Sequence, residues 1–313
     1  SRLPSNRWMH GYLMKVQWVY RQILPIENKT TFLPGYERTG KHMSENPKQA
    51  IESESIMVTR PADGVAVIMI SSQPLGVLRH AVKRALFQTI DTLEQDDSVR
   101  CVVLTGVGKA FSVGSDIRDF SQEVGWLLEN DYWEAGLNQR IEDARFPVIA
   151  ACNGHALGGG AVLALACDFR TASESAKFGF PEVKVGAFAS GSGTQRLPRL
   201  VGRGRALDLF LTGRVITADE ALQYGLVEYV FKDELLPKTL EIATTIASYS
   251  GLVTAAAKTC VNRGLREGWQ TGLNLESELR VKTGRGSDAV EGRNAFLEKR
   301  NPKFNQDNSQ QEP

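Results

Sequence analysis

Three short apolar runs recur at wide spacing along the chain. They cover residues 65–70, 99–104 and 147–152. Runs that are apolar at nearly every position, rather than at alternate positions, are typical of strands buried on both faces of a sheet. We therefore predict a sheet that is covered by helices on both sides.

Helical patterns alternate with these runs. Residues 161–166 predict a short buried helix, and between the first two runs apolar residues recur at helical spacing. This second helical face consists of Ala81, Val82, Ala85, Leu86, Ile90 and Leu93. Alternating strands and helices predict an α/β fold with crossover connections.

The C-terminal part has a different pattern. Thr217 and Glu220 form a capping box that opens a short helix ending at Gly225, and residues 227–231 predict a last strand. Only helices are expected after that, at roughly 235–249, 252–264, 272–283 and 288–299. The chain is thus expected to comprise an extension (1–50), a core (51–234), a helical region (235–304) and a polar tail (305–313).

Composition excludes several classes of function. The chain has 313 residues, with 37 Lys and Arg against 36 Asp and Glu, so it has no global basic field for nucleic acids. No apolar run reaches the roughly 18 residues that a membrane span needs. Its four cysteines lie far apart without a CxxC pair, which disfavours zinc and disulfides and fits a reducing compartment. We expect the cytoplasm, with the mitochondrial matrix as the alternative.

The first 42 residues are unusually basic, with seven Lys or Arg and two acidic residues. Such a stretch is typical of an organellar transit segment. It could equally be a flexible tail or the remnant of an expression tag, because residues 40–43 resemble a tag junction. We expect residues 1–42 to lie outside the fold.

Two glycine-containing loops follow predicted strands. Gly114 lies in the first, and Gly158, Gly159 and Gly160 open the helix after the second. Backbone N–H groups at a helix N-terminus have no intrahelical partner and attract a phosphate or a developing oxyanion. Each loop could instead be a tight turn that allows close helix–strand packing. The spacing is neither GxGxxG nor a P-loop, and the sequence has neither GxSxG nor HExxH.

A third stretch, at residues 178–186, contains Glu182 among mostly apolar neighbours. Burial would raise the pKa of this carboxyl and make it a proton carrier near neutral pH. Alternatively, Glu182 caps a helix or forms a salt bridge with Arg196 or Lys184.

Taken together, the three stretches resemble the crotonase (enoyl-CoA hydratase/isomerase) superfamily from about residue 56 to residue 304. The matching motifs occur in one order: Leu104-Thr105-Gly106, Phe111-x-x-Gly114-x-Asp116-Ile117, residues 147–160, Cys167-Asp168, Phe178-Gly179-x-Pro181-Glu182, residues 193–197, residues 211–213, residues 225–227 and residues 295–300. This order is specific for the superfamily but much less so for the reaction.

The resemblance implies a spiral of ββα units with a C-terminal helical trimerisation region, assembled as trimers or hexamers. It implies acyl-CoA thioesters as substrates, with coenzyme A present only as part of the substrate and without a metal. The N–H groups of Ser115 and Gly159 would form an oxyanion hole for a thioester enolate, and Glu182 would be the catalytic acid/base. The positions implied to contact the acyl-CoA are Val113, Asp116, Ile117, Arg118, Leu157, Gly158, Val162, Phe296 and Lys299.

Val162 departs from the pattern of the hydratases, which have a second glutamate at this position. A valine can neither position water nor carry a proton, whereas one carboxylate suffices for a 1,3-proton shift. We therefore favour double-bond isomerisation by Glu182. The alternatives are a hydratase/lyase with a replacement acid from Asp131, Tyr132 or Glu134, another crotonase-type reaction such as thioester hydrolysis or decarboxylation, and a non-catalytic acyl-CoA binder. Asp131, Tyr132 and Glu134 could instead form a solvated helix face.

Overall fold

Two sheets form the centre of the computed structural model, which describes residues 55–305. The large sheet has six strands in the spatial order β1 (Ile56–Ala62), β2 (Val65–Ile70), β3 (Cys101–Gly106), β5 (Val148–Cys152), β7 (Phe169–Ser173) and β10 (Tyr229–Phe231). The small sheet has four strands in the order β4 (Ala110–Ser112), β6 (His155–Leu157), β8 (Lys177–Gly179) and β9 (Val215–Thr217). The predicted extension 1–50 and nearly all of the predicted tail lie outside the described residues.

Successive turns of the chain repeat one unit. From β3 to Thr212, each of three turns places one strand in the large sheet, the next strand in the small sheet, and then a helix, whereas the first turn places both β1 and β2 in the large sheet. The helices of this part are α2 (His80–Glu94), α3 (Val124–Glu142), α4 (Gly159–Ala166), α5 (Gly193–Val201), α6 (Arg203–Thr212) and α7 (Ala218–Tyr224), with short 3-10 turns η2 (Ile117–Asp119) and η3 (Pro181–Val185). The predicted α/β spiral of ββα units is therefore confirmed.

The pairing of strands agrees with the apolar runs. Strands β2, β3, β5, β7 and β10 are parallel, and β1 alone pairs antiparallel at the edge of the large sheet. The run at 65–70 coincides with β2, whereas the run at 99–104 is shifted two residues relative to β3. The apolar pattern does not predict β1, in which only Ile56 is buried, and it also does not predict β7 and the short strands of the small sheet.

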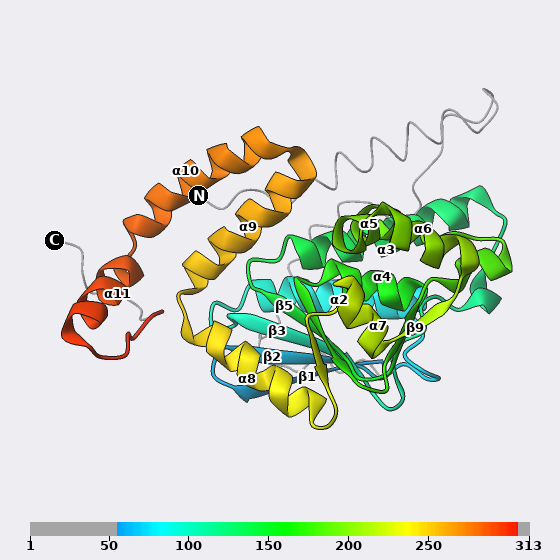
Figure 1. Cartoon of the computed structure of the whole chain (residues 1–313), viewed down its shortest axis with the longest axis horizontal. Coiled ribbons are helices and arrows are strands. Elements are labelled where there is room, and N and C mark those ends of the chain that lie inside the picture. Colours follow the sequence, from blue (N-terminus) through cyan, green and yellow to red (C-terminus); the bar gives the residue numbers. More distant parts are fainter. Residues whose placement is uncertain (1–54, 306–313) are drawn as a thin grey trace, which may run out of the picture.

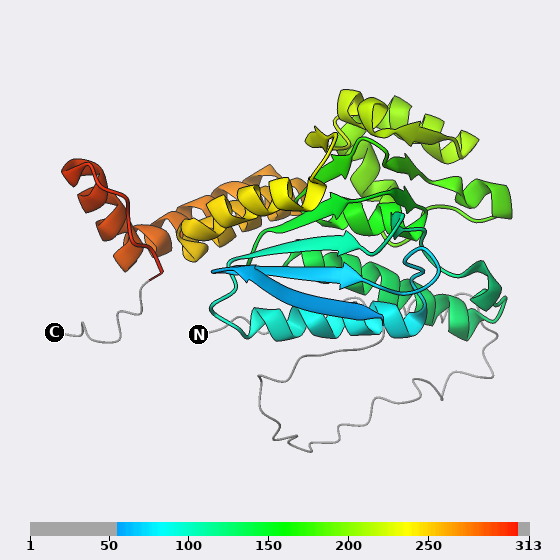
Figure 2. The same cartoon turned by 90° about the horizontal axis from the view of Figure 1, so that it is seen from below.

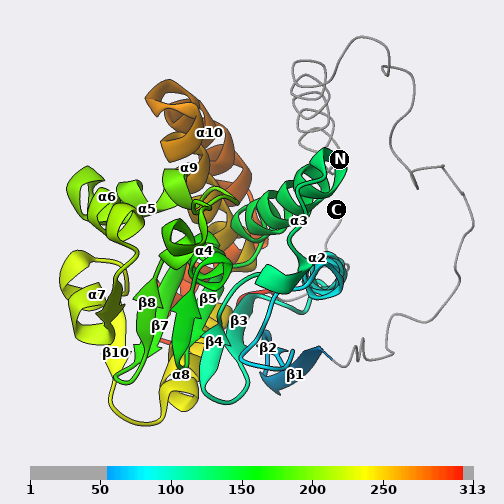
Figure 3. The same ribbon diagram turned by 90° about the vertical axis from the view of Figure 1, so that its right-hand side faces the viewer.

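Helices cover both faces of the large sheet, as the continuous apolar runs predict. Figure 3 shows α2, α3 and α4 on one side and α8 (Leu235–Ser248) on the other. Ala243 and Ala247 of α8 pack on the outer face of the sheet against Val67, Val103 and Ile149. Burial of both faces explains why these strands tolerate so few polar residues.

The buried face of α2 differs in part from the predicted one. It consists of Val82, Lys83, Leu86, Thr89, Ile90 and Leu93. Ala81, expected on this face, is exposed, and a lysine takes part in its place. Farther along, the Thr217 side chain accepts a hydrogen bond from the backbone N–H of Glu220, and Gly225 ends α7 in the left-handed region, as the capping pattern predicts.

The C-terminal helices extend away from the sheets. Helices α9 (Gly251–Glu267) and α10 (Trp269–Gly284) form a hairpin, and α11 (Ser287–Glu298) lies at its far end (Figures 1 and 2). Their positions agree with the four predicted helices within a few residues. Several apolar side chains of the hairpin are exposed, among them Val261, Leu265 and Trp269. No helix among residues 55–305 is both long and apolar enough to cross a membrane.

Candidate active site

The two glycine-containing turns lie against each other. Strands β4 and β6 pair in parallel, so the turns that follow them leave the small sheet at the same edge. A Cβ atom at Gly114, whose φ is +85°, would lie only 2.6 Å from the amide nitrogen of Gly159. A Cβ atom at Gly159 would lie 3.6 Å from the amide nitrogen of Ser115. The structure thus brings together the two N–H groups that the sequence assigns to an oxyanion hole.

Hydrogen bonds hold both turns in place. The N–H of Leu78 donates to the Gly114 carbonyl over 2.9 Å, and the N–H of Gly158 donates to the Gly179 carbonyl over 2.9 Å. Gly159 begins α4, so its N–H has no acceptor within the helix and lies at the positive end of the helix dipole. This arrangement is suited to an oxygen that gains negative charge.

Glu182 lies beside the second turn. It follows β8, which pairs in parallel with β6, and Pro181 starts the 3-10 turn that carries it. Its Oε1 atom would be 3.4 Å from a Cβ atom at Gly158, and its Oε2 atom is buried without a hydrogen-bond partner among the described residues. Burial raises the pKa of Glu182; a hydrogen bond from its own backbone N–H lowers that pKa, and the negative charge of Glu134 raises it further.

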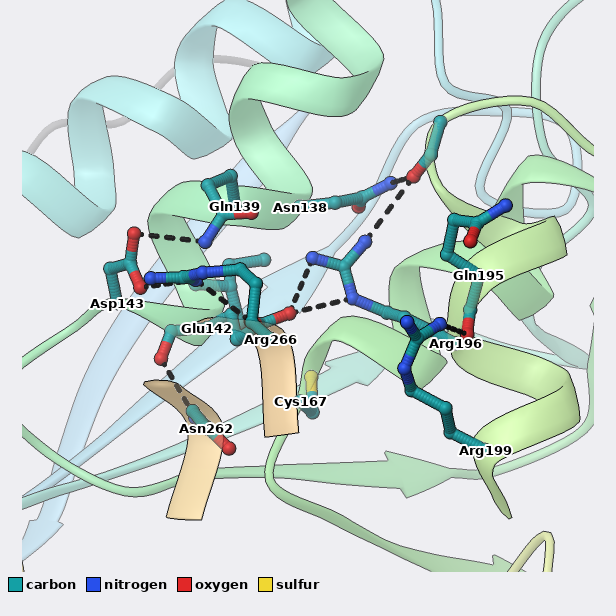
Figure 4. Close-up of polar contacts among 12 residues, drawn as sticks. Asn138, Gln139, Glu142, Asp143, Cys167, Gln195, Arg196, Arg199, Asn262 and Arg266 are labelled. Carbon is teal, nitrogen blue, oxygen red and sulfur yellow. Dashed lines mark hydrogen bonds and ion pairs between the residues drawn. The ribbon is translucent and has the colours of Figure 1, made fainter. Parts of the chain in front are cut away.

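Arg196 does not pair with Glu182, which was one alternative from the sequence. Its guanidinium donates to Glu142 over 2.6 and 2.8 Å (Figure 4). Arg266 of α9 donates to the other oxygen of Glu142 over 3.0 Å, and Asn262 donates to its backbone carbonyl over 3.1 Å. Glu142 at the end of α3 is therefore one of the points at which the C-terminal hairpin is attached to the core.

Asp116 is held by two arginines. Arg118 binds it through Nε and a terminal nitrogen, at 2.8 and 2.7 Å, and Arg79 at the start of α2 donates to it over 3.0 Å. The hydrogen bonds from Arg118, and to a smaller extent that from Arg79, hold the pKa of Asp116 well below its usual value. Arg79 was not singled out from the sequence, because nothing in its local pattern shows that it reaches residue 116.

Val162 belongs to the apolar core. Its side chain is 1% exposed, and a Cβ atom at Gly193 would lie 2.7 Å from its Cγ2 atom. The position where the hydratases have a glutamate is thus an apolar wall here.

The other predicted contact residues divide into two groups. Val113, Leu157 and Ile117 are partly or fully exposed around the glycine turns. Phe296 and Lys299 lie on or directly after α11, at the opposite end of the molecule from α4 (Figure 1), and the chain itself does not bring them to Glu182. Their predicted contact with the substrate would have to come from a neighbouring subunit.

A second buried carboxylate lies at the same turn. Glu134 of α3 is buried, and its Oε1 atom would be 2.7 Å from a Cβ atom at Gly159. Lys83 of α2, also buried, lies 3.7 Å from the Oε2 atom of Glu134 and donates to Ser115 Oγ over 2.9 Å. Asp131 and Tyr132 are partly exposed, so the expected solvated helix face does not extend to Glu134.

The spiral α/β fold thus brings two glycine turns together beside a partly buried glutamate, and backbone N–H groups arranged in this way can stabilise a developing oxyanion. The sequence profile described as enoyl-CoA hydratase/isomerase matches residues 60–308, and the chain belongs to this family of acyl-CoA enzymes.

Individual relatives agree with this assignment. The crotonyl-CoA hydratase of Syntrophomonas wolfei is 41% identical over 219 residues, covering 69% of this chain and 84% of its own. The protein YngF of Bacillus subtilis is 40% identical over 255 residues, covering 79% and 96%. The crystal structure of an enoyl-CoA hydratase from Bacillus anthracis superimposes with a TM-score of 0.77 at 37% identity, covering 80% of this chain and 98% of that one.

Proposed function

We propose that the protein removes a proton from carbon 2 of an enoyl-CoA thioester to form an enolate. The reaction that follows from this step is the conversion of a 3-enoyl-CoA to the conjugated 2-enoyl-CoA. The observation that carries this proposal is the position of Glu182. Its side chain is partly buried and lies beside Gly158, and one of its oxygens, Oε2, is buried without a hydrogen-bond partner among the described residues. Such a group can exchange a proton with a substrate bound at the glycine turns.

The proton shift needs only one carboxylate. Ionised Glu182 removes a proton from carbon 2, and the electron pair of that C–H bond moves into the thioester to form an enolate. The enolate oxygen accepts hydrogen bonds from the N–H groups of Ser115 and Gly159, and each such donor contributes about 3–4 kcal/mol to lowering a barrier. Neutral Glu182 then returns the proton to carbon 4 as the double bond moves to carbons 2 and 3. The raised pKa of Glu182 makes it a stronger base than an ordinary glutamate.

Coenzyme A is proposed to bind partly across a subunit interface. Phe296 and Lys299 are exposed at the end of α11, which lies at the opposite end of the molecule from α4 (Figure 1). The exposed apolar residues of the α9–α10 hairpin support assembly into a trimer or a pair of trimers, in which α11 of one subunit would reach the site of the next.

Incubation with a 3-enoyl-CoA tests the proposal directly. We expect the ultraviolet absorbance of the conjugated thioester to appear without a change in mass. Glu182→Gln and Glu182→Ala should slow this reaction by about 100- to 10,000-fold. Unchanged isomerisation in a folded Glu182→Ala variant would contradict the role of Glu182. Release of free coenzyme A or of carbon dioxide would point to a thioesterase or a decarboxylase, and tight binding without turnover to a non-catalytic binder.

Hydration of a 2-enoyl-CoA is the second candidate reaction. It is favoured by a second carboxylate at the site, the buried Glu134, and by the similarity to the crotonyl-CoA hydratase of Syntrophomonas wolfei. Crotonyl-CoA is the natural first substrate for this assay, in which the product gains the mass of one water.

A further inference from the structure

Two carboxylates reach the same glycine dipeptide from different elements. Glu182 approaches Gly158 from η3, and Glu134 approaches Gly159 from α3. They are close enough for the charge of Glu134 to raise the pKa of Glu182. Gly159 carries one of the N–H groups of the oxyanion hole, so a thioester bound there would lie next to both carboxylates.

Lys83 compensates the charge of Glu134. Its ammonium group is 1% exposed and has three neighbours on two elements: Glu134 and Asn130 of α3, and Ser115 of the first turn. Burial lowers the pKa of Lys83, and the charge of Glu134 partly offsets this effect. The pair therefore fixes Glu134 in position relative to Ser115.

Packing alone does not account for these residue types. A buried ion pair contributes little net stability, since desolvation of the two charges offsets their attraction, and apolar residues of the same volume pack as well. The pair also lies at the glycine turns, where the substrate would bind. A reaction that uses a second carboxylate explains why Glu134 is present at this buried position instead of an apolar residue.

We propose that Glu134 is a second catalytic residue of this site and that Lys83 is its positioning residue. The pair gives the enzyme a hydratase activity, for which Val162, at the position of the second glutamate of hydratases, has no ionisable group. This inference rests on the proposed function, because it takes Glu182 as the proton carrier at carbon 2. The two carboxylates act at different atoms: Glu182 exchanges a proton with carbon 2, whereas Glu134 acts on the water molecule that adds to carbon 3.

The addition of water balances with two carboxylates. Ionised Glu134 takes a proton from a water molecule as the water oxygen forms a bond to carbon 3. The electron pair of the double bond moves to carbon 2 and the thioester oxygen, and neutral Glu182 donates its proton to carbon 2. One water has been added: its hydroxyl is on carbon 3 and its proton on Glu134, while carbon 2 has received the proton of Glu182. Loss of the proton from Glu134 and protonation of Glu182 reset the site.

The test compares two activities in the same variants. Wild-type protein should hydrate crotonyl-CoA and isomerise a 3-enoyl-CoA. Glu134→Gln should lower hydration by at least about 100-fold, as expected for the loss of a general base, and isomerisation by less than tenfold. Glu129→Gln is the matched control, because Glu129 is an exposed residue of the same helix; it should change both rates by less than twofold. Glu134→Asp, which keeps the charge but shortens the side chain, should retain more hydration than Glu134→Gln.

The outcomes separate this inference from the proposed function. Hydration that persists in Glu134→Gln, or a wild-type enzyme that isomerises without hydrating, overturns the role of Glu134 and leaves that of Glu182 intact. If Glu134→Gln does not fold, equal hydration by wild-type protein and Glu134→Asp overturns the inference. Full activity of Glu182→Gln in both assays overturns the proposed function itself.

Discussion

Lys83 donates a hydrogen bond from Nζ to Ser115 Oγ over 2.9 Å, which connects the buried face of α2 directly to the first glycine turn. The same ammonium group lies 3.7 Å from Glu134. One cation thus links a proposed oxyanion-hole residue to a carboxylate from another helix.

The free energy of unfolding should depend on both members of this pair. Lys83→Met leaves Glu134 as a buried charge without its counter-ion, and removal of one partner of such a pair costs about 3–5 kcal/mol. Replacing both, as Lys83→Met with Glu134→Leu, should recover most of this loss. Urea unfolding of the three variants and wild-type protein measures the cycle, and strictly additive effects would contradict direct coupling of the two residues.

Hydration kinetics give an independent measure of the same coupling. If Lys83 acts through Glu134, Lys83→Met should add little to the loss of hydration already caused by Glu134→Gln. A purely structural role would instead slow hydration and isomerisation alike in each single variant. The turnover of crotonyl-CoA and of a 3-enoyl-CoA by Lys83→Met, Glu134→Gln and the double variant distinguishes these cases.

Close contact between the turns predicts that Gly114→Ala is strongly impaired. Its Cβ atom would lie 2.6 Å from the amide nitrogen of Gly159, so the turns would have to separate. Loss of one oxyanion-hole donor costs about 100- to 1,000-fold in rate. Gly108→Ala is the matched control: Gly108 has a similar φ of +82° but no atom within 4 Å of its Cβ position. It should lose about 1–2 kcal/mol of stability from left-handed strain while keeping its rate.

The pH dependence of isomerisation should follow Glu182. The reaction needs the ionised carboxylate, and burial raises the pKa of Glu182 above its ordinary value of 4.5. The rate should therefore decrease with decreasing pH at a midpoint above pH 4.5. A pH profile of turnover between pH 4 and 9 measures this midpoint, and an acid limb at or below pH 4.5 would contradict a buried base.

Glu182 should also make stability depend on pH. Because its pKa is higher in the folded than in the unfolded state, its contribution to stability is greatest below the unfolded pKa and is lost as the pH rises through the folded pKa. Glu182→Gln removes this dependence. The variant should become more stable relative to wild-type protein between about pH 4 and pH 8, as measured by the difference in melting temperature. A constant difference across this range would be inconsistent with the raised pKa.

Leu265 offers a test of assembly through the hairpin. Its side chain is 67% exposed in the isolated chain. Leu265→Asp should reduce the mass in solution to that of a monomer and raise the KM for the acyl-CoA, because Phe296 and Lys299 would no longer reach a neighbouring site. Light scattering after gel filtration measures the mass. A wild-type monomer with full activity would contradict shared sites.

The sequence was sufficient for the parts of the site that follow parallel strands. The turns at Gly114 and Gly159 and the loop carrying Glu182 leave neighbouring strands of the small sheet, which the apolar pattern does not predict, so their proximity was implied by the family resemblance. Glu182 was also expected to be buried, because its neighbours in sequence are apolar.

Side chains that meet through packing of helices were harder to predict. Lys83 lies among apolar residues of α2, where a lysine gives no local signal of burial. Glu134 lies on a helix with polar residues on several sides, so its pattern does not define an inner face. Their meeting depends on how α2 and α3 pack, over a separation of about fifty residues, and the sequence pattern carries no information about that geometry.

Helix α3 carries Glu134 near its middle and Glu142 at its last residue. The eight residue steps from Glu134 to Glu142 span about 12 Å of continuous helix. Arg266 and Asn262 of the C-terminal hairpin hold Glu142. One continuous helix thus connects the hairpin, through Glu142, to the carboxylate that is proposed to act on water, so a shift of the hairpin would be transmitted to Glu134 along the helix axis.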